Sequence, residues 1–301
     1  MRLKLHALAL IAAREWVEAS RGRGIWIMAA LLTALPLLLS AVGLGLSGAG
    51  RAQGLARTGA SLVSLSNYLV PLFGLQLAQA SLAGEAERGT LALLAVQPLP
   101  RRWIVLGKFA GLAALLAAVV CGSFTVAGVL VALRSGASSA GDYAVLVGSS
   151  VLLGWAFVAI GLWVSSAARD RAQALAGAFG AWLFFAVVLD LVLLGVFVAA
   201  SHAFLGGDHA PSVELLHREL TRGVTGDESP LPWLSALVLV NPTGVFRLWN
   251  VLRSPALRQI LAMTRSLPPV VQSPGLLAAA SLAWIAGPLW CAARRFEVAD
   301  L

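Results

Sequence analysis

Few residues in this chain have the types and spacing that nucleotide chemistry requires. A phosphate-binding loop needs a lysine that directly follows a glycine and directly precedes a serine or threonine, which together hold phosphates and magnesium. Lys4 follows Leu3, and Lys108 follows Gly107 but precedes Phe109. The sequence therefore predicts no catalytic residues and no ATP hydrolysis by this chain.

The possible metal ligands are spaced unfavourably. His202, His209 and His217 lie seven and eight residues apart, which does not place them on one face of a helix. Cys121 and Cys291 form no CxxC pair, and only three methionines are present. We therefore expect no metal site, no disulfide and no cofactor bound by this chain.

Asp190 is an acidic residue inside a long apolar stretch. A carboxylate near the bilayer centre costs about 2.5–3.5 kcal/mol on insertion, so it is a candidate functional group. Counting from Ala172 at 1.5 Å per residue puts Asp190 about 27 Å along its helix, close to the far interface. Two interpretations stay open, either a functional intramembrane carboxylate or a boundary residue that is solvated or hydrogen-bonded to a neighbouring helix.

The composition identifies the solvent of most of the chain as lipid. Of the 301 residues, 59% are hydrophobic and 12% are charged, whereas soluble domains carry about 25% charged residues. Stretches long enough to cross a bilayer lie at 25–47, 61–84, 109–133, 143–168, 172–201 and 275–293. They do not alternate as barrel strands do, so we predict one all-α domain over 1–301 with six transmembrane helices.

Basic residues predict the orientation of these helices. With the N-terminus inside, thirteen basic residues fall on the inner side and three in the short outer loops. The inner set is Arg2, Lys4, Arg14, Arg21, Arg23, Arg88, Arg101, Arg102, Lys108, Arg169, Arg171, Arg294 and Arg295, and the outer set is Arg51, Arg57 and Arg134. We predict that both termini are inside. We attribute the net charge of +8 to membrane topology and to contact with membrane lipids rather than to binding of nucleic acid.

Two segments outside the spans have helical character. Residues 2–20 place Leu5, Leu8, Ala12 and Trp16 three to four apart, with Glu15 among the polar residues offset from them, which predicts an amphipathic helix in the membrane surface. The long outer loop, 202–274, contains an apolar run at 231–240 that is too short to span. We expect an interfacial or re-entrant helix there, ended by Asn241-Pro242.

The segment 84–109 between the second and third spans carries the largest set of candidate contacts. Acidic residues open it, where they favour a helix N-terminus, and prolines close it. It is either an ordinary charged loop or a docking element for a cytoplasmic motor. The candidate docking residues are Glu85, Glu87, Arg88, Gly89, Thr90, Leu91 and Arg101, and the second candidate is the turn Arg169, Asp170 and Arg171.

The outer loop carries candidate contacts to a second partner. Buried aromatic residues and arginines supply most of the binding energy at protein interfaces. Trp233, Phe246, Arg247 and Trp249 are therefore the candidates for contact with an outer partner. The alternative is that residues 231–252 pack back on the helices of this protein.

The segment GEAERGTLALLAVQPLPRRWIVLGKF (84–109) resembles the first cytoplasmic loop of ABC-2 type permeases, and the resemblance implies that ATP and magnesium are bound by a partner ATPase. Within that family, the chain is most similar to the membrane subunits of the ABC complexes that mature nitrous-oxide reductase. The strings that carry this similarity are SLSNYLVPLFGLQLAQASLAGEAERGTLALL (64–94), LDLVLL (189–194) and LPWLSALVLVNPTGVFRLWNV (231–251). The resemblance implies a homodimer of this chain, two separate ATPase subunits and a periplasmic β-helical accessory protein. It also implies the bacterial inner membrane and a role in copper-site maturation of the reductase during denitrification.

Two other functions remain open from the sequence. One is an ABC-2 exporter of a lipid, drug or glycan, and the other is an intramembrane enzyme, for which one intramembrane acid is too few. A homodimer requires close approach of helices, which small residues permit. The candidates are residues 61–84 and Ala174, Gly177, Ala178 and Ala181.

Overall fold

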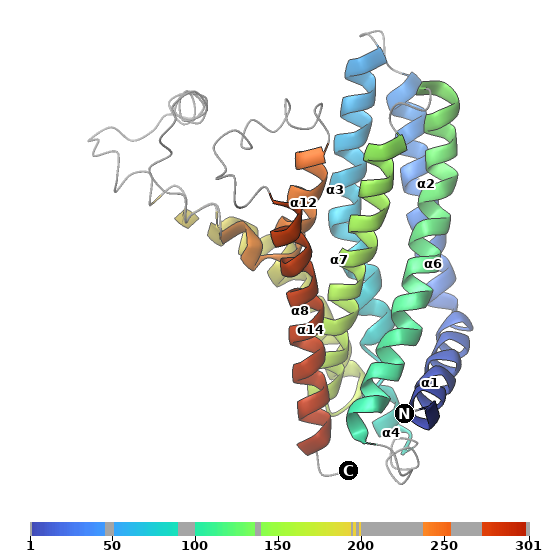
Figure 1. The fold of residues 1–301 in the computed structure, drawn as a ribbon, viewed down its shortest axis with the longest axis vertical. Coiled ribbons are helices and arrows are strands. Elements are labelled where there is room, and N and C mark those ends of the chain that lie inside the picture. The colour runs from blue at the N-terminus through green and yellow to red at the C-terminus, as the bar shows by residue number, and fades with distance from the viewer. Residues whose placement is uncertain are drawn as a thin grey trace.

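The computed structural model describes residues 2–45, 51–89, 100–135, 140–193, 195–196, 199, 237–253 and 273–298. Every regular element in these ranges is a helix (Figure 1). The all-α prediction is therefore confirmed for the described residues. Backbone groups in a lipid environment must find their hydrogen bonds inside the same segment, which long apolar sequences achieve as helices.

The described residues between 2 and 89 form four helices. They are α1 (Arg2–Ser20), α2 (Arg23–Gly45), α3 (Arg51–Ala78) and the short α4 (Ala83–Glu87). Helices α1 and α2 are bent by 78° at the break between Ser20 and Arg23. This bend suits a surface helix that leads into a span.

The described residues from 100 onward form the remaining helices. They are α6 (Arg101–Ser135), α7 (Ala140–Ala167), α8 (Arg171–Leu183), the π-helix η2 (Phe184–Val188), the 3-10 helix η3 (Leu237–Val240), α12 (Pro242–Arg253) and α14 (Pro274–Val298). Residues 189–193 continue the helix of α8 and η2. Among the described residues, five helices are long and apolar enough to cross a membrane, or six if the bent α1–α2 pair counts as one span.

Several helices extend beyond the predicted spans. Helix α3 begins at Arg51 rather than at residue 61, and α6 begins at Arg101 rather than at residue 109. Hydropathy marks the part of a helix that lies in hydrocarbon, whereas the helix itself continues into the interface. Lys108 consequently lies two turns inside α6 rather than in a loop.

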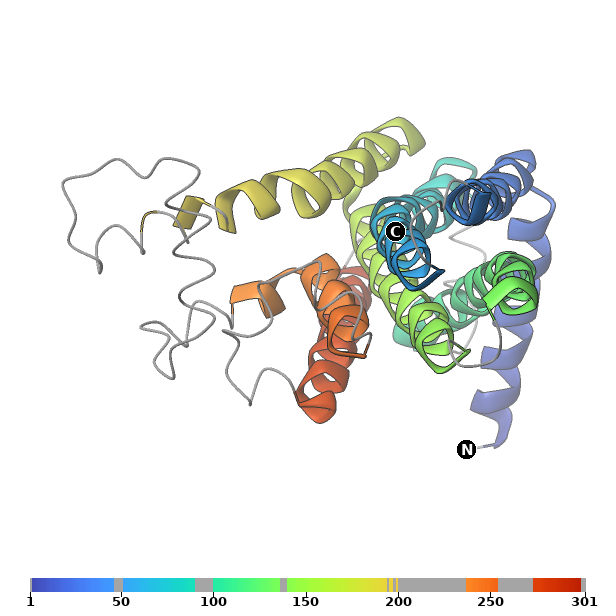
Figure 2. The same ribbon diagram turned by 90° about the horizontal axis from the view of Figure 1, so that it is seen from above.

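Helix α7 forms the centre of the bundle, with α3, α6, α12 and α14 around it. The most apolar stretch of α7 is 72% buried inside the protein. The helix from Arg171 to Leu193 is called the fifth span below, and its most apolar stretch is only 11% buried. Figure 2 shows that the fifth span diverges from the other helices towards its C-terminal end. Glycines permit close packing at the centre, since a Cβ on Gly74 would lie 2.9 Å from the carbonyl oxygen of Gly154.

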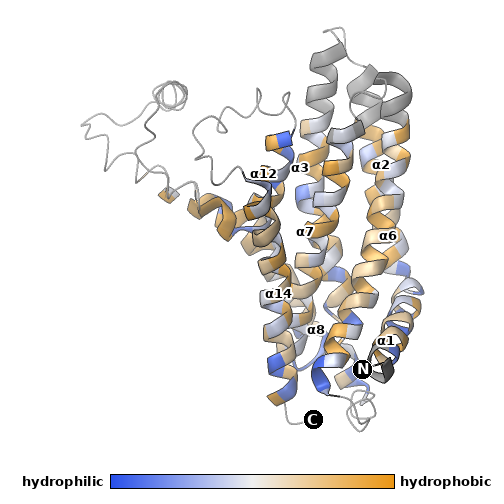
Figure 3. Cartoon of the chain, viewed as in Figure 1, coloured by the Kyte–Doolittle hydropathy of each residue, from blue (hydrophilic) through white to orange (hydrophobic). Residues whose placement is uncertain are grey.

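Helix α1, α4 and the end of α14 lie at one end of the bundle, which is called the lower end here as it is drawn in Figure 1. Figure 3 shows hydrophilic residues at the lower ends of α6 and α14 and apolar residues along the middle of the helices. Basic residues at this end include Arg101 and Arg102 on α6 and Arg294 and Arg295 on α14. The assignment of the lower end to the cytoplasm rests on that charge distribution and stays a prediction.

Candidate functional site

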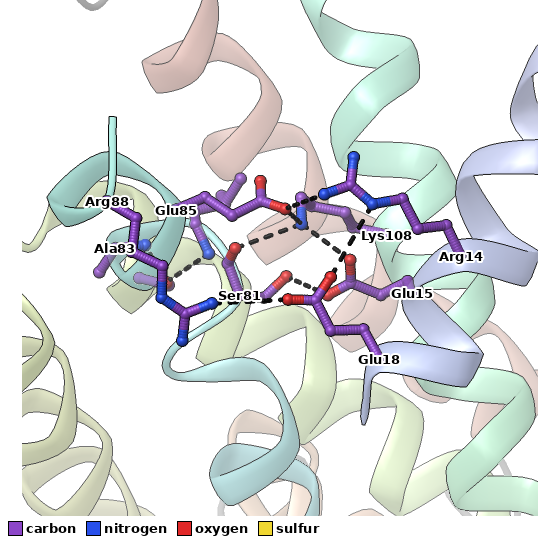
Figure 4. Close-up of polar contacts among 10 residues, drawn as sticks. Arg14, Glu15, Glu18, Ser81, Ala83, Glu85, Arg88 and Lys108 are labelled. Carbon is purple, nitrogen blue, oxygen red and sulfur yellow. Dashed lines mark hydrogen bonds and ion pairs between the residues drawn. The ribbon is translucent and has the colours of Figure 1, made fainter. Parts of the chain in front are cut away.

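A buried ion cluster joins three helices at the lower end (Figure 4). The side chain of Lys108 is 2% exposed, and its Nζ lies 2.8 Å from Glu15 Oε2 and 3.0 Å from Glu85 Oε1. The same ammonium donates to the carbonyl oxygen of Ser81 at 3.2 Å. Ser81 Oγ donates to Glu15 Oε1 at 2.6 Å. Lys108, Glu15, Glu85 and Ser81 are called the lysine cluster below.

Two glycines on α6 allow α1 to reach this lysine. A Cβ on Gly107 would lie 2.8 Å from Ile11 Cβ, and a Cβ on Gly111 would lie 2.9 Å from Glu15 Cβ. The G-x-x-x-G spacing places both glycines on one side of α6, where the α1 backbone lies against them. This contact brings the Glu15 carboxylate next to Lys108. A charge removed from water needs such a partner, because an unpaired buried ion is very costly.

Glu85, a predicted docking residue, belongs to this cluster rather than to the surface. The residue is 6% exposed. Besides Lys108, its Oε1 lies 3.8 Å from Arg14 Nη2. A side chain buried in this way positions α4 but does not reach a partner directly.

Helix α4 is fixed from its other side by α7. The backbone N–H groups of Leu82 and Ala83 donate to Ser165 Oγ at 3.1 and 3.0 Å. The helix ends at Glu87 and is followed by Arg88 and then by Gly89, which has a φ of 70°. That left-handed conformation costs glycine little and is a common helix terminator. The predicted residue Gly89 therefore has a defined conformational role, which is to turn the chain away from α4.

The two predicted cytoplasmic segments lie together in the structure. Glu87 Oε2 accepts a hydrogen bond from the backbone N–H of Arg171 at 3.3 Å. Asp170 Oδ1 accepts from the N–H of Gln173 at 2.7 Å and caps α8. Both carboxylates face a helix N-terminus, where unpaired N–H groups favour negative charge. Helix α4 is thereby linked to α8 as well as to α1 and α6.

The remaining predicted docking residues are exposed or engaged elsewhere. Arg88 and Arg169 are exposed, and Arg88 Nη1 lies 3.6 Å from Glu18 Oε1 on α1. Arg101 Nη1 lies 3.5 Å from the carbonyl oxygen of Phe296, in the last turn of α14. A cation there offsets the negative end of the helix dipole. Thr90 and Leu91 lie outside the described residues.

A second polar network lies at the opposite end of the fifth span. Arg247 Nη2 on α12 lies 2.5 Å from Asp190 Oδ1 and 2.6 Å from Asp190 Oδ2. Asn241 Nδ2 donates to Asp190 Oδ1 at 2.9 Å and to the carbonyl oxygen of Phe185 at 3.0 Å. Asn241 Oδ1 accepts from the N–H of Thr243 at 3.0 Å. Of the two interpretations of Asp190, the structure thus shows a carboxylate hydrogen-bonded to neighbouring elements.

Asn241-Pro242 was expected to end the apolar run at 231–240, and among the described residues the 3-10 helix η3 does end at Val240. The same two residues also begin α12, which was not expected. Asn241 caps the start of α12, and Pro242 is its first residue. A proline suits that position because its missing N–H would have no partner there. Asn241 is therefore both the N-cap of α12 and a contact to the fifth span.

The aromatic residues expected to contact an outer partner are mostly turned inward. Phe246 is 2% exposed and belongs to the main hydrophobic core. Trp249 Nε1 donates to Ser281 Oγ on α14 at 3.3 Å. Over 237–253 the structure has the alternative arrangement, in which this part of the loop packs back on the protein. Trp233 lies outside the described residues.

The small residues of the fifth span contact neighbouring helices of the same chain. Ala174 and Ala178 are fully or almost fully buried, and a Cβ on Gly177 would lie 2.7 Å from Val164 Cγ1 on α7. Ala181 packs against the main core. This face is used within one protomer, so a second chain would approach the fifth span from another side.

Several of the connecting residues were not predicted. Glu15 was assigned to the polar face of a surface helix, Asn241 was named only as the end of an apolar segment, and Ser81 and Ser165 were not singled out. The available signals were the spacing of Gly107 and Gly111 around Lys108 and the capping preference of asparagine. No group of three or more potential metal ligands occurs among the residues that the structure describes.

Comparison with known proteins identifies the family to which the sequence is similar. The sequence profile of the ABC-2 family transporter proteins matches residues 9–301. A probable ABC transporter permease protein NosY of Pseudomonas aeruginosa is 32% identical over 291 residues, which are 94% of this chain and 93% of the relative. A probable ABC transporter permease protein NosY of Stutzerimonas stutzeri is 34% identical over 245 residues, 80% of each chain.

Proposed function

The chain belongs to the ABC-2 family of transporter proteins as a membrane permease, and from this premise we propose that it transmits ATP-driven movement from a separate ATPase across a bacterial inner membrane. Membrane subunits of ABC transporters are not themselves ATPases, and a permease implies a partner subunit that is. The proposed output is maturation of the copper sites of nitrous-oxide reductase. Its support is the similarity to the two NosY permeases.

One observation carries the proposed coupling. Helix α4 is a five-residue element with direct polar links to four other helices, namely α1 and α6 through the lysine cluster, α7 through Ser165 and α8 through Glu87. A force applied at α4 is thus passed to several helices at once. We propose that α4 is the docking element and that the lower end faces the cytoplasm.

The proposed ATPase contacts are the exposed residues around α4. Glu87, Arg88 and Gly89 are exposed, as are Arg169 and Asp170 in the adjacent turn. Opposite charges alternate on this surface, which favours a specific partner of complementary charge over a uniform membrane surface. In the proposal, Glu85 and Arg101 position this surface from behind, because Glu85 is buried and Arg101 contacts the end of α14.

The docking proposal is tested by charge reversal in the assembled transporter. We expect Arg88→Glu and Arg169→Glu together to weaken co-purification of the ATPase subunit and to reduce ATP hydrolysis by the complex. The matched control is Arg253→Glu, an exposed arginine at the end of α12, away from α4. Undiminished co-purification with the double reversal would place the docking site elsewhere.

The biological output is tested separately in cells. We expect a strain lacking this chain to produce nitrous-oxide reductase with depleted copper, and we expect the intact gene to restore the metal content. Full copper content without the chain would favour the alternative, an ABC-2 exporter of a lipid, drug or glycan. The periplasmic β-helical accessory protein that the resemblance implies remains part of the proposal.

A further inference from the structure

Among the residues that the structure describes, the fifth span makes few contacts along its length, one of which is the hydrogen bond from Trp182 Nε1 to the carbonyl oxygen of Tyr68 at 3.1 Å. Beyond the small residues at its start, Phe184, Val188 and Leu191 are 47%, 40% and 62% exposed. At its lower end it is tied to α4 by the hydrogen bond between Glu87 and the Arg171 N–H. Its upper end is tied through Asp190 and Phe185 to Asn241 and Arg247. A helix fastened mainly at two ends can transmit displacement from one to the other.

The upper fastening depends on the π-helix at Phe184–Val188. The wider π turn changes the backbone hydrogen-bonding pattern, since the N–H of Leu189 bonds to the carbonyl oxygen of Phe184, five residues earlier. Such turns are rare and often mark functional positions. Here the carbonyl oxygen of Phe185 accepts from Asn241 Nδ2. The π turn thus presents the carbonyl oxygen of Phe185, and the helical turn after it presents the carboxylate of Asp190, to the side-chain amide of Asn241.

Asn241 connects these acceptors to the start of α12. It is 0% exposed and caps α12 through the Thr243 N–H. Arg247, one turn further along α12, reaches the same carboxylate. Helix α12 in turn packs on α7 and α14, with Val245, Phe246 and Leu248 buried. Because of these contacts, a displacement of the fifth span at Asp190 is transmitted to α12 rather than absorbed by the surrounding lipid.

We infer that Asn241, Asp190 and Arg247 form a clamp through which the fifth span moves α12 when the transporter binds nucleotide. This inference rests on the proposed function and specifies which residues carry its coupling to the far end of the bundle. Asn241 is a positioning residue that holds α12 to the π turn. Arg247 and Asp190 supply a charged contact that tolerates partial exposure, with side chains 42% and 25% exposed.

The test uses single reporter cysteines in the assembled transporter. The two free cysteines, Cys121 and Cys291, are first replaced by alanine. Arg253→Cys then reports on the end of α12, and Ala172→Cys, at an exposed position in the first turn of α8, reports on the lower end of the fifth span. Reaction rates with a maleimide are measured in lipid nanodiscs, with and without a non-hydrolysable ATP analogue.

With the clamp intact, we expect nucleotide to change the reaction rate at both reporters. In Asn241→Ala and in Arg247→Gln, the change at Arg253→Cys should be lost while the change at Ala172→Cys remains. The matched control is Asn250→Ala, because Asn250 is a buried asparagine on the same helix that bonds to Ser149 on α7 and not to the fifth span. This control should retain both changes even if its thermal stability falls.

The outcomes separate the clamp from the function on which it rests. Retention of the nucleotide response at Arg253→Cys in both clamp variants would overturn the clamp and leave the proposed function standing. An absence of response at both reporters in the intact protein would overturn the proposed function and the clamp together. Arg247→Lys keeps the charge and is expected to keep part of the α12 response, which a purely steric role for Arg247 would not require.

Discussion

At the residue scale, Lys108 shows how one side chain changes role with its surroundings. In the sequence it lies among arginines next to an apolar span, where basic residues normally meet lipid headgroups. In the structure it is surrounded by Glu15, Glu85 and the Ser81 carbonyl oxygen. Two carboxylates from different helices thus converge on a single ammonium, so the lysine holds α1 and α4 to α6.

Removal of that ammonium should be strongly destabilising. Lys108→Met leaves two buried carboxylates without their shared cation, and breaking a buried ion pair in this way costs about 3–5 kcal/mol. We expect a lower midpoint in thermal unfolding of the detergent-solubilised chain. The combined variant Glu15→Gln, Glu85→Gln and Lys108→Met removes the charges together and should recover part of the loss. Equal stability of Lys108→Met and the native chain would mean that the cluster does not hold the helices.

At the element scale, the contact between α1 and α6 depends on the absence of side chains. Ile11 and Ala12 of α1 lie where a Cβ on Gly107 or Gly111 would be. A surface helix predicted from its apolar face alone would need only lipid beneath it. This helix instead packs on a second helix, and that contact brings Glu15 within reach of Lys108.

Adding one methyl group at this contact should separate the two helices. Gly111→Ala would place its Cβ against the Ala12 carbonyl oxygen, a backbone atom that cannot rotate away. Overpacking of this kind costs about 1–3 kcal/mol. The matched control is Gly122→Ala on the same helix, where nothing lies within 4 Å of the added Cβ.

We expect a lower thermal unfolding midpoint for Gly111→Ala and none of that loss for Gly122→Ala. The same comparison is made for co-purification of the ATPase subunit, because α1 supports α4 through the lysine cluster. Identical midpoints for the two variants would show that α1 does not depend on close contact with α6.

At the scale of the whole molecule, the fifth span presents an apolar face that the described part of the chain leaves uncovered. Leu175 and Phe179 on α8 are 50% and 57% exposed. Lipid can cover such a face, and so can a second copy of the chain. A homodimer is implied by the ABC-2 resemblance, because two ATPase subunits each require a docking element.

We expect this face to be close to its counterpart in a homodimer. In the cysteine-free chain, Phe179→Cys should form an intermolecular disulfide in native membranes under mild oxidation. Leu282→Cys on α14 is the matched control, because Leu282 is 60% exposed and also apolar. Crosslinking through Leu282→Cys alone would move the interface to α14, and monomers in both cases would contradict the homodimer.

The sequence by itself determined the features that depend on local composition. Long apolar stretches predicted α7 and α14 within a few residues, since a run of this length in lipid forms a helix whatever its neighbours are. The strings around α4 indicated the ABC-2 family, which the comparison with known proteins supports. The absence of a phosphate-binding loop is likewise apparent from the sequence alone.

Only the tertiary structure decided which charged residues face one another. Glu85 and Glu87 are two residues apart and have the same chemistry, yet one is buried against Lys108 and the other is exposed beside α8. Asp190 and Arg247 are 57 positions apart, and their contact depends on a π turn and on an asparagine that caps another helix. Pairings between distant segments depend on how whole helices pack, because a rotation of one helix by a single residue, about 100°, would turn each of these side chains elsewhere.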